Sequence, residues 1–408
     1  MPSVVRSYSG RCRLKFDIGV ELETDFQLQL RSDGNIDVIA KAPGTLESDT
    51  VMKALEDETL VTCSLIGSIP NATGKIAIPK LLLKAIEIEN KYHGSIAILE
   101  LISLDPAEIE YAQTRLDQTV EIHYGLTNFV FMGCEYSRWE GGISLDKFTT
   151  KLDGMKLTFK HLQGYRSTVK DLTRSRDGAV TAEAIATVSS ASMKQVDELV
   201  GDALALLSYA TGTYIAAIYQ DVYSSDALIK STLYFAKTGP YVPDMWIIDA
   251  NNLYDCDLQI FLETCYPRLN ELKSDLGLNV VLEFLVLANQ GGYLEVRFLL
   301  YSVAAECLLS YLPSYLKKIG ETGDMSSFRS KMKNILEHFN MAYRESELDF
   351  IRIRDHVVHT GRFPSNVDPS KETDKLGNLL DRTVLTILGY KGKFYLNRTN
   401  RYAREVLL

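Results

Sequence analysis

The sequence is poor in cysteine, and its cysteines lack the spacing of a metal site. Six are spread over 408 residues, at Cys12, Cys63, Cys134, Cys256, Cys265 and Cys307. No two form a Cys-x-x-Cys pair, and their density is far below that of a disulfide-stabilised secreted domain. We therefore expect reduced, buried thiols and no structural zinc site.

The sequence also lacks the apolar segments that would direct it out of the cytoplasm. The first residues, MPSVVRSYSGRCRLKF, contain no apolar run of the kind a secretion signal needs. The longest apolar region, 298–316, contains Glu306 and Pro313 and is followed by Lys317. These residues favour a buried helix over a membrane span. We expect a cytoplasmic protein with no membrane partner.

The phosphate-binding and nucleophile motifs of three large enzyme classes are missing. The sequence has no GxxxxGK(S/T) loop, no GxGxxG after a strand and no GxSxG elbow. These absences argue against a P-loop ATPase, a Rossmann dehydrogenase and an α/β-hydrolase. We expect no cofactor and no metal ligands.

The composition is that of a folded protein with two or three domains. Apolar residues make up 46%, and 44 Lys and Arg stand against 53 Asp and Glu, a net charge of −9. The charge is uneven: residues 291–408 contain 18 basic and 14 acidic residues, whereas residues 1–290 have a net charge of −13. A mildly basic C-terminal part can attract polyanions locally.

Residues 1–190 show the pattern of a β-rich domain. Short runs of β-branched and aromatic residues alternate with Gly, Asn and Asp. They predict strands within 60–67, 95–104, 119–133, 155–162 and 179–188. One stretch, PKLLLKAIEIENKY at 79–92, is interpreted as a helix because of its apolar spacing and its Pro in the first turn. A sandwich-like arrangement of strands is expected.

Residues 191–277 mix helices and strands and form a continuation or connector. Helices are predicted at 192–212 and 257–277, with strands at 213–223 and 228–237 between them. From 278 the pattern becomes helical, with candidates at 278–290, 292–317, 325–342, 345–360 and 371–388. The predicted fold class is therefore α+β, a β-rich N-terminal domain followed by an all-α bundle at 278–408.

The fourth of these helices contains an arginine within its apolar face. At 100° per residue, Phe350, Ile351, Val357 and Val358 define a face centred at about 40°. Arg354 also falls at about 40°, where a guanidinium is costly unless a carboxylate, a phosphate or a second subunit neutralises it. His359 lies about 140° away from Arg354 on an ideal helix, beside Thr360 and Gly361, where the helix is expected to end.

Residues 354–359, RDHVVH, resemble the R-x4-H motif of HEPN domains. The polar residue after the arginine and the Thr-Gly that follows the histidine are similar to what that family shows. The resemblance extends over about 278–390, including an acid, Glu306, inside the long first helix. A β-rich domain in front of such a bundle is similar to ApeA-type abortive-infection proteins of bacteria.

The resemblance implies a metal-independent endoribonuclease that acts as a homodimer. Histidine can move protons near neutral pH, and arginine can bind the scissile phosphate. Arg354 and His359 would be catalytic, with Asp355 orienting one of them and Glu306 pairing with Arg354. Arg352 lies on nearly the same helix face as His359 and is an alternative phosphate-binding residue. Arg352, His356, Lys391 and Lys393 are candidates for substrate binding.

The implied setting is bacterial anti-phage defence. The substrate would be cellular RNA, tRNA included, and the N-terminal domain would sense a phage-derived trigger that the sequence does not identify. The aromatic and basic residues of 389–404 could stack on and neutralise single-stranded RNA, or pack on the bundle instead. The alternative function is a non-catalytic HEPN-like module that dimerises or binds a nucleotide or RNA, with Arg354 bridging Glu306 inside the bundle.

Overall fold

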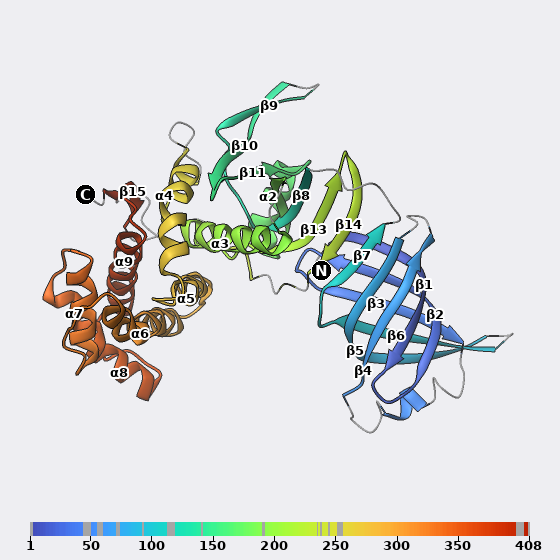
Figure 1. The fold of residues 1–408 in the computed structure, drawn as a ribbon. Helices are drawn as coiled ribbons and strands as arrows, with labels where there is room; N and C mark the ends of the chain where they lie inside the picture. Colours follow the sequence, from blue (N-terminus) through green and yellow to red (C-terminus); the bar gives the residue numbers. More distant parts are fainter. Residues whose placement is uncertain are drawn as a thin grey trace. The chain divides into compact units, whose positions relative to one another are not determined.

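The structure is a computed structural model that divides into two compact units (Figure 1). It describes residues 3–43, 50–54, 60–70, 74–91, 94–111, 119–139, 142–189, 192–234, 236, 239–243, 245–250, 256–396 and 404–406. Unit 1 comprises 1–129, 161–191 and 216–238, and unit 2 comprises 130–160, 192–215 and 239–408. The sequence boundaries near 190 and 277 remain predictions, because this division follows contacts and assigns 130–160 to the helical unit.

Unit 1 begins with a closed ring of antiparallel strands. They are β1 (Val4–Phe16), β2 (Glu21–Arg31), β3 (Ile36–Pro43), β4 (Thr62–Ile69), β5 (Gly74–Lys91) and β6 (Gly94–Ser103). Each pairs with two others in the order β1-β2-β3-β6-β5-β4, and β4 pairs back onto β1. The predicted β-rich character is confirmed. The pairings close a ring rather than stacking two separate sheets.

The ring encloses an apolar core because alternate side chains point inward. Along β2 the burial alternates at nearly every residue, with Phe26, Leu28 and Leu30 buried. Neighbouring strands add Leu14, Val38 and further aliphatic side chains that are wholly buried. Burying this apolar surface is the main stabilising contribution to the ring.

The antiparallel sheet of unit 1 continues beyond the ring. Strands β7 (Ala107–Tyr111), β14 (Ala227–Leu233), β13 (Ala217–Ser224), β8 (Val120–Thr127) and β12 (Val180–Val188) pair in this order, starting from β5. One helix, α2 (Tyr165–Ser175), also belongs to unit 1, and it was not predicted from the sequence. Only Leu172 of α2 is buried, so its apolar periodicity is too weak to mark a helix.

A buried ion pair joins β1 to β13. Arg6 donates two hydrogen bonds to Asp221, at 3.0 and 2.5 Å, and its guanidinium lies 3.9 Å from the ring centre of Tyr219. Asp221 is 1% exposed and also accepts from Ser231 Oγ at 2.6 Å. Burial opposes the charge of Arg6, but Asp221 more than compensates, and the pKa of the guanidinium is raised. The pair therefore fixes the N-terminal strand to the sheet.

The substitution Arg6→Ala should destabilise the protein by about 3–5 kcal/mol, because the carboxylate of Asp221 would stay buried without its cation. Urea unfolding measures this change. The control is Arg13→Ala, since Arg13 pairs with Glu23 at 3.2 Å on the surface, and it should cost less than about 1 kcal/mol. Equal, small losses for both variants would contradict a structural role for the Arg6–Asp221 pair.

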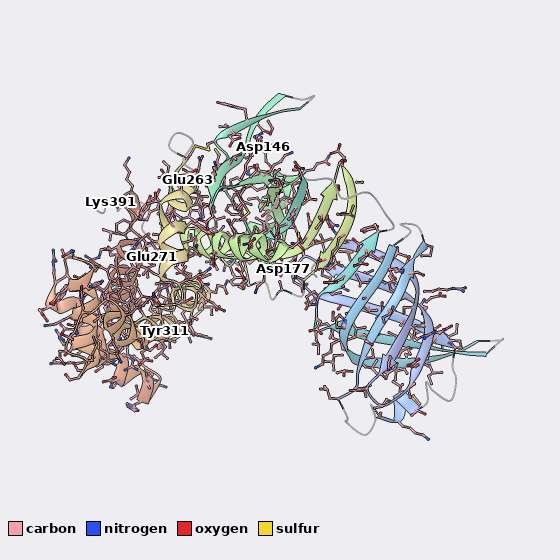
Figure 2. All side chains as sticks on the ribbon, in the orientation of Figure 1. Asp146, Asp177, Glu263, Glu271, Tyr311 and Lys391 are labelled. Atoms are coloured by element: carbon pink, nitrogen blue, oxygen red, sulfur yellow. A yellow bond between two sulfur atoms is a disulfide. The ribbon has the colours of Figure 1, made fainter. Side chains whose placement is uncertain are left out.

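Unit 2 combines three antiparallel strands with the helices. The strands are β9 (Glu135–Trp139), β10 (Gly142–Leu152) and β11 (Met155–His161), and β10 pairs with both others. The helices are α3 (Met193–Thr211), α4 (Asp257–Leu272), α5 (Leu278–Gln290), α6 (Leu294–Lys318), α7 (Phe328–His338), η2 (Glu345–Asp349), α8 (Phe350–Thr360) and α9 (Pro369–Ile387), followed by β15 (Lys393–Tyr395) and β16 (Arg404–Val406). Glu263 and Glu271 project from α4 (Figure 2). The predicted helical C-terminal half is confirmed.

The prediction of a helix at 79–92 is wrong, because 79–91 belong to β5, and residue 92 lies outside the described residues. From Ile76 to Leu83, burial follows the period of a strand, with Ile76, Ile78, Leu81 and Leu83 buried. Pro79, taken as a helix start, lies where the pairing of β4 and β5 shifts register between Ile78 and Leu81. Proline is tolerated at such irregularities because no ladder N–H is needed there. The alternation in Ile86-Glu-Ile88-Glu was the overlooked signal.

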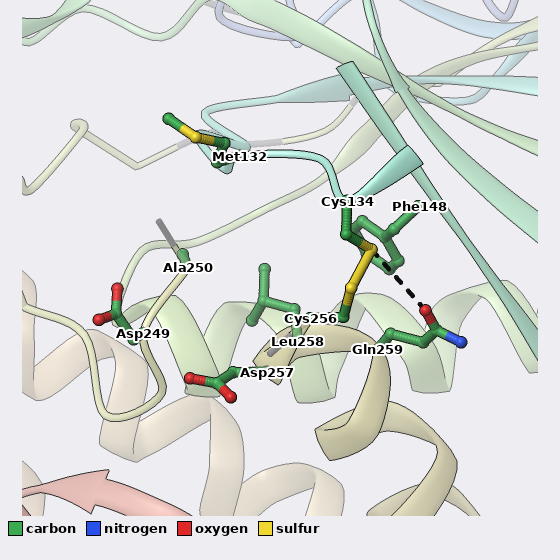
Figure 3. Close-up of a pocket in the computed structure, with 9 residues that line it drawn as sticks. All are labelled: Met132, Cys134, Phe148, Asp249, Ala250, Cys256, Asp257, Leu258 and Gln259. Carbon is green, nitrogen blue, oxygen red and sulfur yellow. Dashed lines mark hydrogen bonds between the residues drawn. A yellow bond between two sulfur atoms is a disulfide. The ribbon is translucent and has the colours of Figure 1, made fainter. Parts of the chain in front are cut away.

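The expectation that every cysteine is a reduced thiol is also wrong. Cys134 and Cys256 form a disulfide across 122 residues of sequence, with their Cα atoms 5.8 Å apart (Figure 3). Cys12, Cys63 and Cys265 are free and buried, and burial raises the pKa of each thiol. Two cysteines so distant in sequence carry no spacing signal, and only the fold brings them together.

Helix α6 corresponds to the long apolar region of the sequence. By length and composition it is the one helix among the described residues that could cross a membrane. A core helix meets the same criterion, and α6 packs against α5 and α9 through buried residues that include Phe298, Leu308 and Leu312. The packing agrees with the predicted buried helix.

Candidate functional site

The candidate site is built on α8, whose last turn is well defined. The helix ends at Gly361, which has a φ of 69°, the left-handed conformation that glycine adopts without strain. The Gly361 N–H donates to Val357 O at 2.8 Å, and Thr360 Oγ1 donates to His356 O at 2.8 Å. The sequence prediction that the helix ends just after His359 is confirmed, and His359 lies in this last turn.

The first turn of α8 is held to its neighbours by ion pairs through η2. Arg329 of α7 donates to Glu345 Oε2 at 2.9 Å and lies 3.5 Å from Asp349, and Lys333 pairs with Glu345 at 2.5 Å. The hydrogen bonds from Lys333 and Arg329 lower the pKa of Glu345. Arg382 of α9 pairs with Glu347. These contacts were not predicted from the sequence, although the three acidic residues within 345–349 were a signal for them.

The buried face of α8 is rotated from the one predicted. Phe350, Ile353 and Val357 are buried, and they lie at about 0°, −60° and −20° on the helix. Val358 is 55% exposed, so its assignment to the apolar face is wrong. Because the buried residues of α8 are Phe350, Ile353 and Val357, Arg354 lies at the edge of the buried face rather than at its centre.

Arg354 is surrounded by groups that neutralise and cover it. Its guanidinium pairs with Glu306 of α6 and with Asp355, the latter at 3.0 Å. It also lies 5.4 Å from the ring centre of Phe328 in α7. The Arg354 side chain is 22% exposed, so part of it remains accessible to a ligand. The predicted pairing of Glu306 with Arg354 is present in the structure.

Within the described part of one chain, His359 is not bonded to Arg354 or to the carboxylates that pair with it. His359 is exposed, as are Arg352, Asp355 and His356. Among the described residues, no hydrogen bond or ion pair joins His359 to Arg354 or Asp355. Asp355 therefore contacts the arginine and not the histidine. Arg352, seven residues before His359, shares its exposed side of the helix.

The remaining predicted substrate-binding residues lie beyond α9. Lys391 projects from the segment between α9 and β15 (Figure 2), and Lys393 begins β15; both are exposed. The aromatic residues beside them do not offer ring faces for stacking. Tyr390 and Phe394 are buried, and Tyr390 packs edge-on against Phe261 at 5.4 Å. Arg398, Arg401 and Tyr402 lie outside the described residues.

The described residues contain no group of three or more His, Cys, Asp or Glu side chains placed to bind a metal ion. The site is a cationic helix with one paired arginine, one exposed arginine and exposed histidines. Such groups can bind a phosphate and transfer protons. No family model matches the chain, and no curated protein matches it.

The substitution Arg354→Ala should cost about 1–3 kcal/mol of unfolding free energy, since it removes a guanidinium that hydrogen-bonds carboxylates. Arg352→Ala is the matched control, because Arg352 is an exposed arginine on the same helix, and its effect should lie within about 0.5 kcal/mol. Urea unfolding of both variants gives the comparison. Equal stability of the two would contradict the packing of Arg354 between α6, α7 and α8.

Proposed function

We propose that this protein is a metal-independent endoribonuclease whose active site is formed by Arg354 and His359 of α8, with Asp355 assisting. The observation that carries the proposal is the contrast between the two residues. Arg354 is fixed in place by Glu306, whereas His359 is exposed at the end of the same helix. A fixed cation and an accessible proton-transfer group are the two components that phosphodiester cleavage through a 2′-hydroxyl needs.

The reaction uses the RNA itself as the nucleophile. The 2′-oxygen attacks phosphorus, the bond from phosphorus to the 5′-oxygen breaks, and a 2′,3′-cyclic phosphate and a free 5′-hydroxyl result. One histidine removes the 2′-hydroxyl proton or donates a proton to the 5′-oxygen. The arginine stabilises the negative charge that develops on the phosphoryl oxygens. DNA lacks the 2′-hydroxyl and is inert in this reaction.

The proposed site requires two chains. Arg354 and His359 lie about 140° apart on α8, so one helix cannot direct both at a single phosphate. Two α8 helices facing each other in a homodimer would place Arg354 of one chain near His359 of the other. Within one chain, Arg352 and His359 share a face, and Arg352 is the alternative phosphate-binding residue. His356, Lys391 and Lys393 would contact the RNA backbone.

The biological setting follows from the resemblance to HEPN domains and abortive-infection proteins. In that setting the helical bundle is the nuclease, and the β-rich part restrains it until a phage-derived trigger is present. The nuclease then degrades cellular RNA, tRNA included, in the cytoplasm.

A non-catalytic bundle is the second candidate, favoured by the engagement of Arg354 with two carboxylates. In this alternative the arginine only joins α6 to α8, and the exposed side of α8 binds a nucleotide, RNA or a second copy. The two candidates differ in what His359 does, because an exposed histidine contributes little to packing.

The test compares the full-length protein with His359→Ala, using labelled RNA in excess EDTA. We expect His359→Ala to lower the cleavage rate by about 10²–10⁴-fold, the range that a general acid or base contributes. The matched control is His356→Ala, an exposed histidine on the same helix. Its proposed role is contact with the RNA backbone and not proton transfer, so it should lose far less.

Because activation can require a trigger, the same variants are also expressed in cells challenged with phage. Growth arrest and RNA loss with the wild type, and neither with His359→Ala, would support the nuclease. Equal behaviour of the wild type and His359→Ala in both assays would overturn it and favour the binding module.

A further inference from the structure

The outward face of the β10–β11 hairpin carries four lysines around a pair of threonines. The strand register places Lys147 opposite Lys160, Thr149 opposite Thr158, and Lys151 opposite Lys156. All six side chains fall on the same side of the hairpin, because residues two apart share a face. Lys151, Lys156 and Lys160 are exposed, and the two threonine hydroxyls lie 3.2 Å apart. We refer to this surface as the lysine face.

The four lysines of the lysine face repel one another and therefore lower the stability of the hairpin. Like charges directly opposite each other on an antiparallel pair repel, and here this happens twice within six positions. Within the part of the chain that the structure describes, none of the four lysines forms an ion pair. Glu135 on β9 is opposite Lys147, yet it makes no ion pair with it. A protein with a net charge of −9 thus concentrates uncompensated positive charge on one hairpin.

The acid nearest the hairpin tip is directed to the other side. Asp153 and Gly154 form the two-residue turn, with φ values of 46° and 81° as this tight hairpin turn requires. The Asp153 carboxylate accepts hydrogen bonds from Tyr266 at 3.1 Å and Asn270 at 3.4 Å, both on α4. It therefore does not neutralise Lys151 and Lys156, which form the second cross-strand pair from the turn.

The opposite face of the hairpin anchors it to the helices of unit 2. Phe148 and Phe159 are buried and stack at 4.9 Å, and Thr150 donates to Glu263 of α4 at 3.3 Å. The disulfide ties Cys134, just before β9, to Cys256 at the start of α4 (Figure 3). The lysine face is thus presented on a rigid support rather than on a loop.

We propose that the lysine face binds the sugar-phosphate backbone of a nucleic-acid strand. Lysine ammonium groups neutralise phosphates, and threonine hydroxyls donate hydrogen bonds to phosphate oxygens. The two lysine pairs are four residues apart along the strands, a distance of about 14 Å, which spans several phosphates of an extended strand. None of the six residues of the lysine face is aromatic or acidic, so they have no group suited to reading bases, and the binding is independent of sequence.

An anionic membrane surface is the competing ligand, and the face fits it less well. Membrane-surface binding combines positive charge with apolar side chains that insert between lipids. Between the lysine pairs this hairpin places Thr149 and Thr158. On the other face, Phe148, Leu152, Leu157 and Phe159 are buried.

The experiment measures binding of the full-length protein to fluorescent oligo(U) and oligo(dT) over a salt series. Four phosphate contacts on a single strand predict a loss of affinity of about 50-fold between about 50 and 200 mM salt. Lys151→Gln with Lys156→Gln should reduce this loss to about 7-fold. Lys151→Arg with Lys156→Arg should restore it, because the charge is retained.

The matched control is Lys194→Gln with Lys230→Gln, which also removes two surface lysines. Those lysines already pair with Glu198 and Glu108, at 3.8 and 3.2 Å, so binding should not change. The Tm of the variant with Lys151→Gln and Lys156→Gln should equal or exceed that of the wild type, because a repulsion between like charges is removed.

Unchanged affinity and salt dependence in the Gln variant would overturn the proposal, as would binding to anionic vesicles with none to either oligonucleotide. Oligo(dT) cannot be cleaved through a 2′-hydroxyl, so its binding tests this surface whether or not the protein is a ribonuclease. Binding to both oligonucleotides with the predicted salt dependence would support it and identify the phosphate backbone as the ligand.

Discussion

The packing of α8 on α6 depends on neutralising the charge of Arg354. A guanidinium at the edge of an apolar contact is acceptable only with a carboxylate beside it, and α6 supplies Glu306. The same contact determines which side of α8 faces outward. With Ile353 and Val357 against the bundle, the exposed side carries Arg352, Val358 and His359. The Arg354–Glu306 ion pair thus helps to determine which side chains of α8 are exposed to solvent.

Periodic segments were predictable from the sequence, and segments of mixed pattern were not. The helix at 278–290 has the predicted bounds, because its apolar residues recur at helical spacing between two glycines. The helix prediction at 79–92 was wrong because Leu81, Leu82 and Leu83 fit both a helical and a strand period. In the structure these three residues pair with neighbouring strands of the sheet. The ring closure of β1 to β6 and the Cys134–Cys256 disulfide depend on contacts between distant residues, which no local pattern encodes.

The sequence indicated candidate residues on α8, but not which side of the helix is buried. The spacing in 354–359 singled out Arg354 and His359, and Glu306 was identified as an acid within an apolar helix. The predicted apolar face of α8 was wrong because Ile351 and Val358 were assigned to it only for their hydrophobic side chains. The structure turns α8 so that Ile353 is buried instead, which a single helix in isolation cannot reveal. The lysine face was missed because the pairing of its lysines needs the register of β10 and β11.

In the proposed ribonuclease, Arg354 of one chain works with His359 of another. The most direct measurement mixes two inactive variants, Arg354→Ala and His359→Ala, by co-expression and measures RNA cleavage. A mixed dimer would contain one intact site assembled from two chains, so a two-chain site predicts recovery to about a quarter of wild-type activity in a random mixture. No recovery, in a mixture shown to contain the mixed dimer, would contradict the two-chain site.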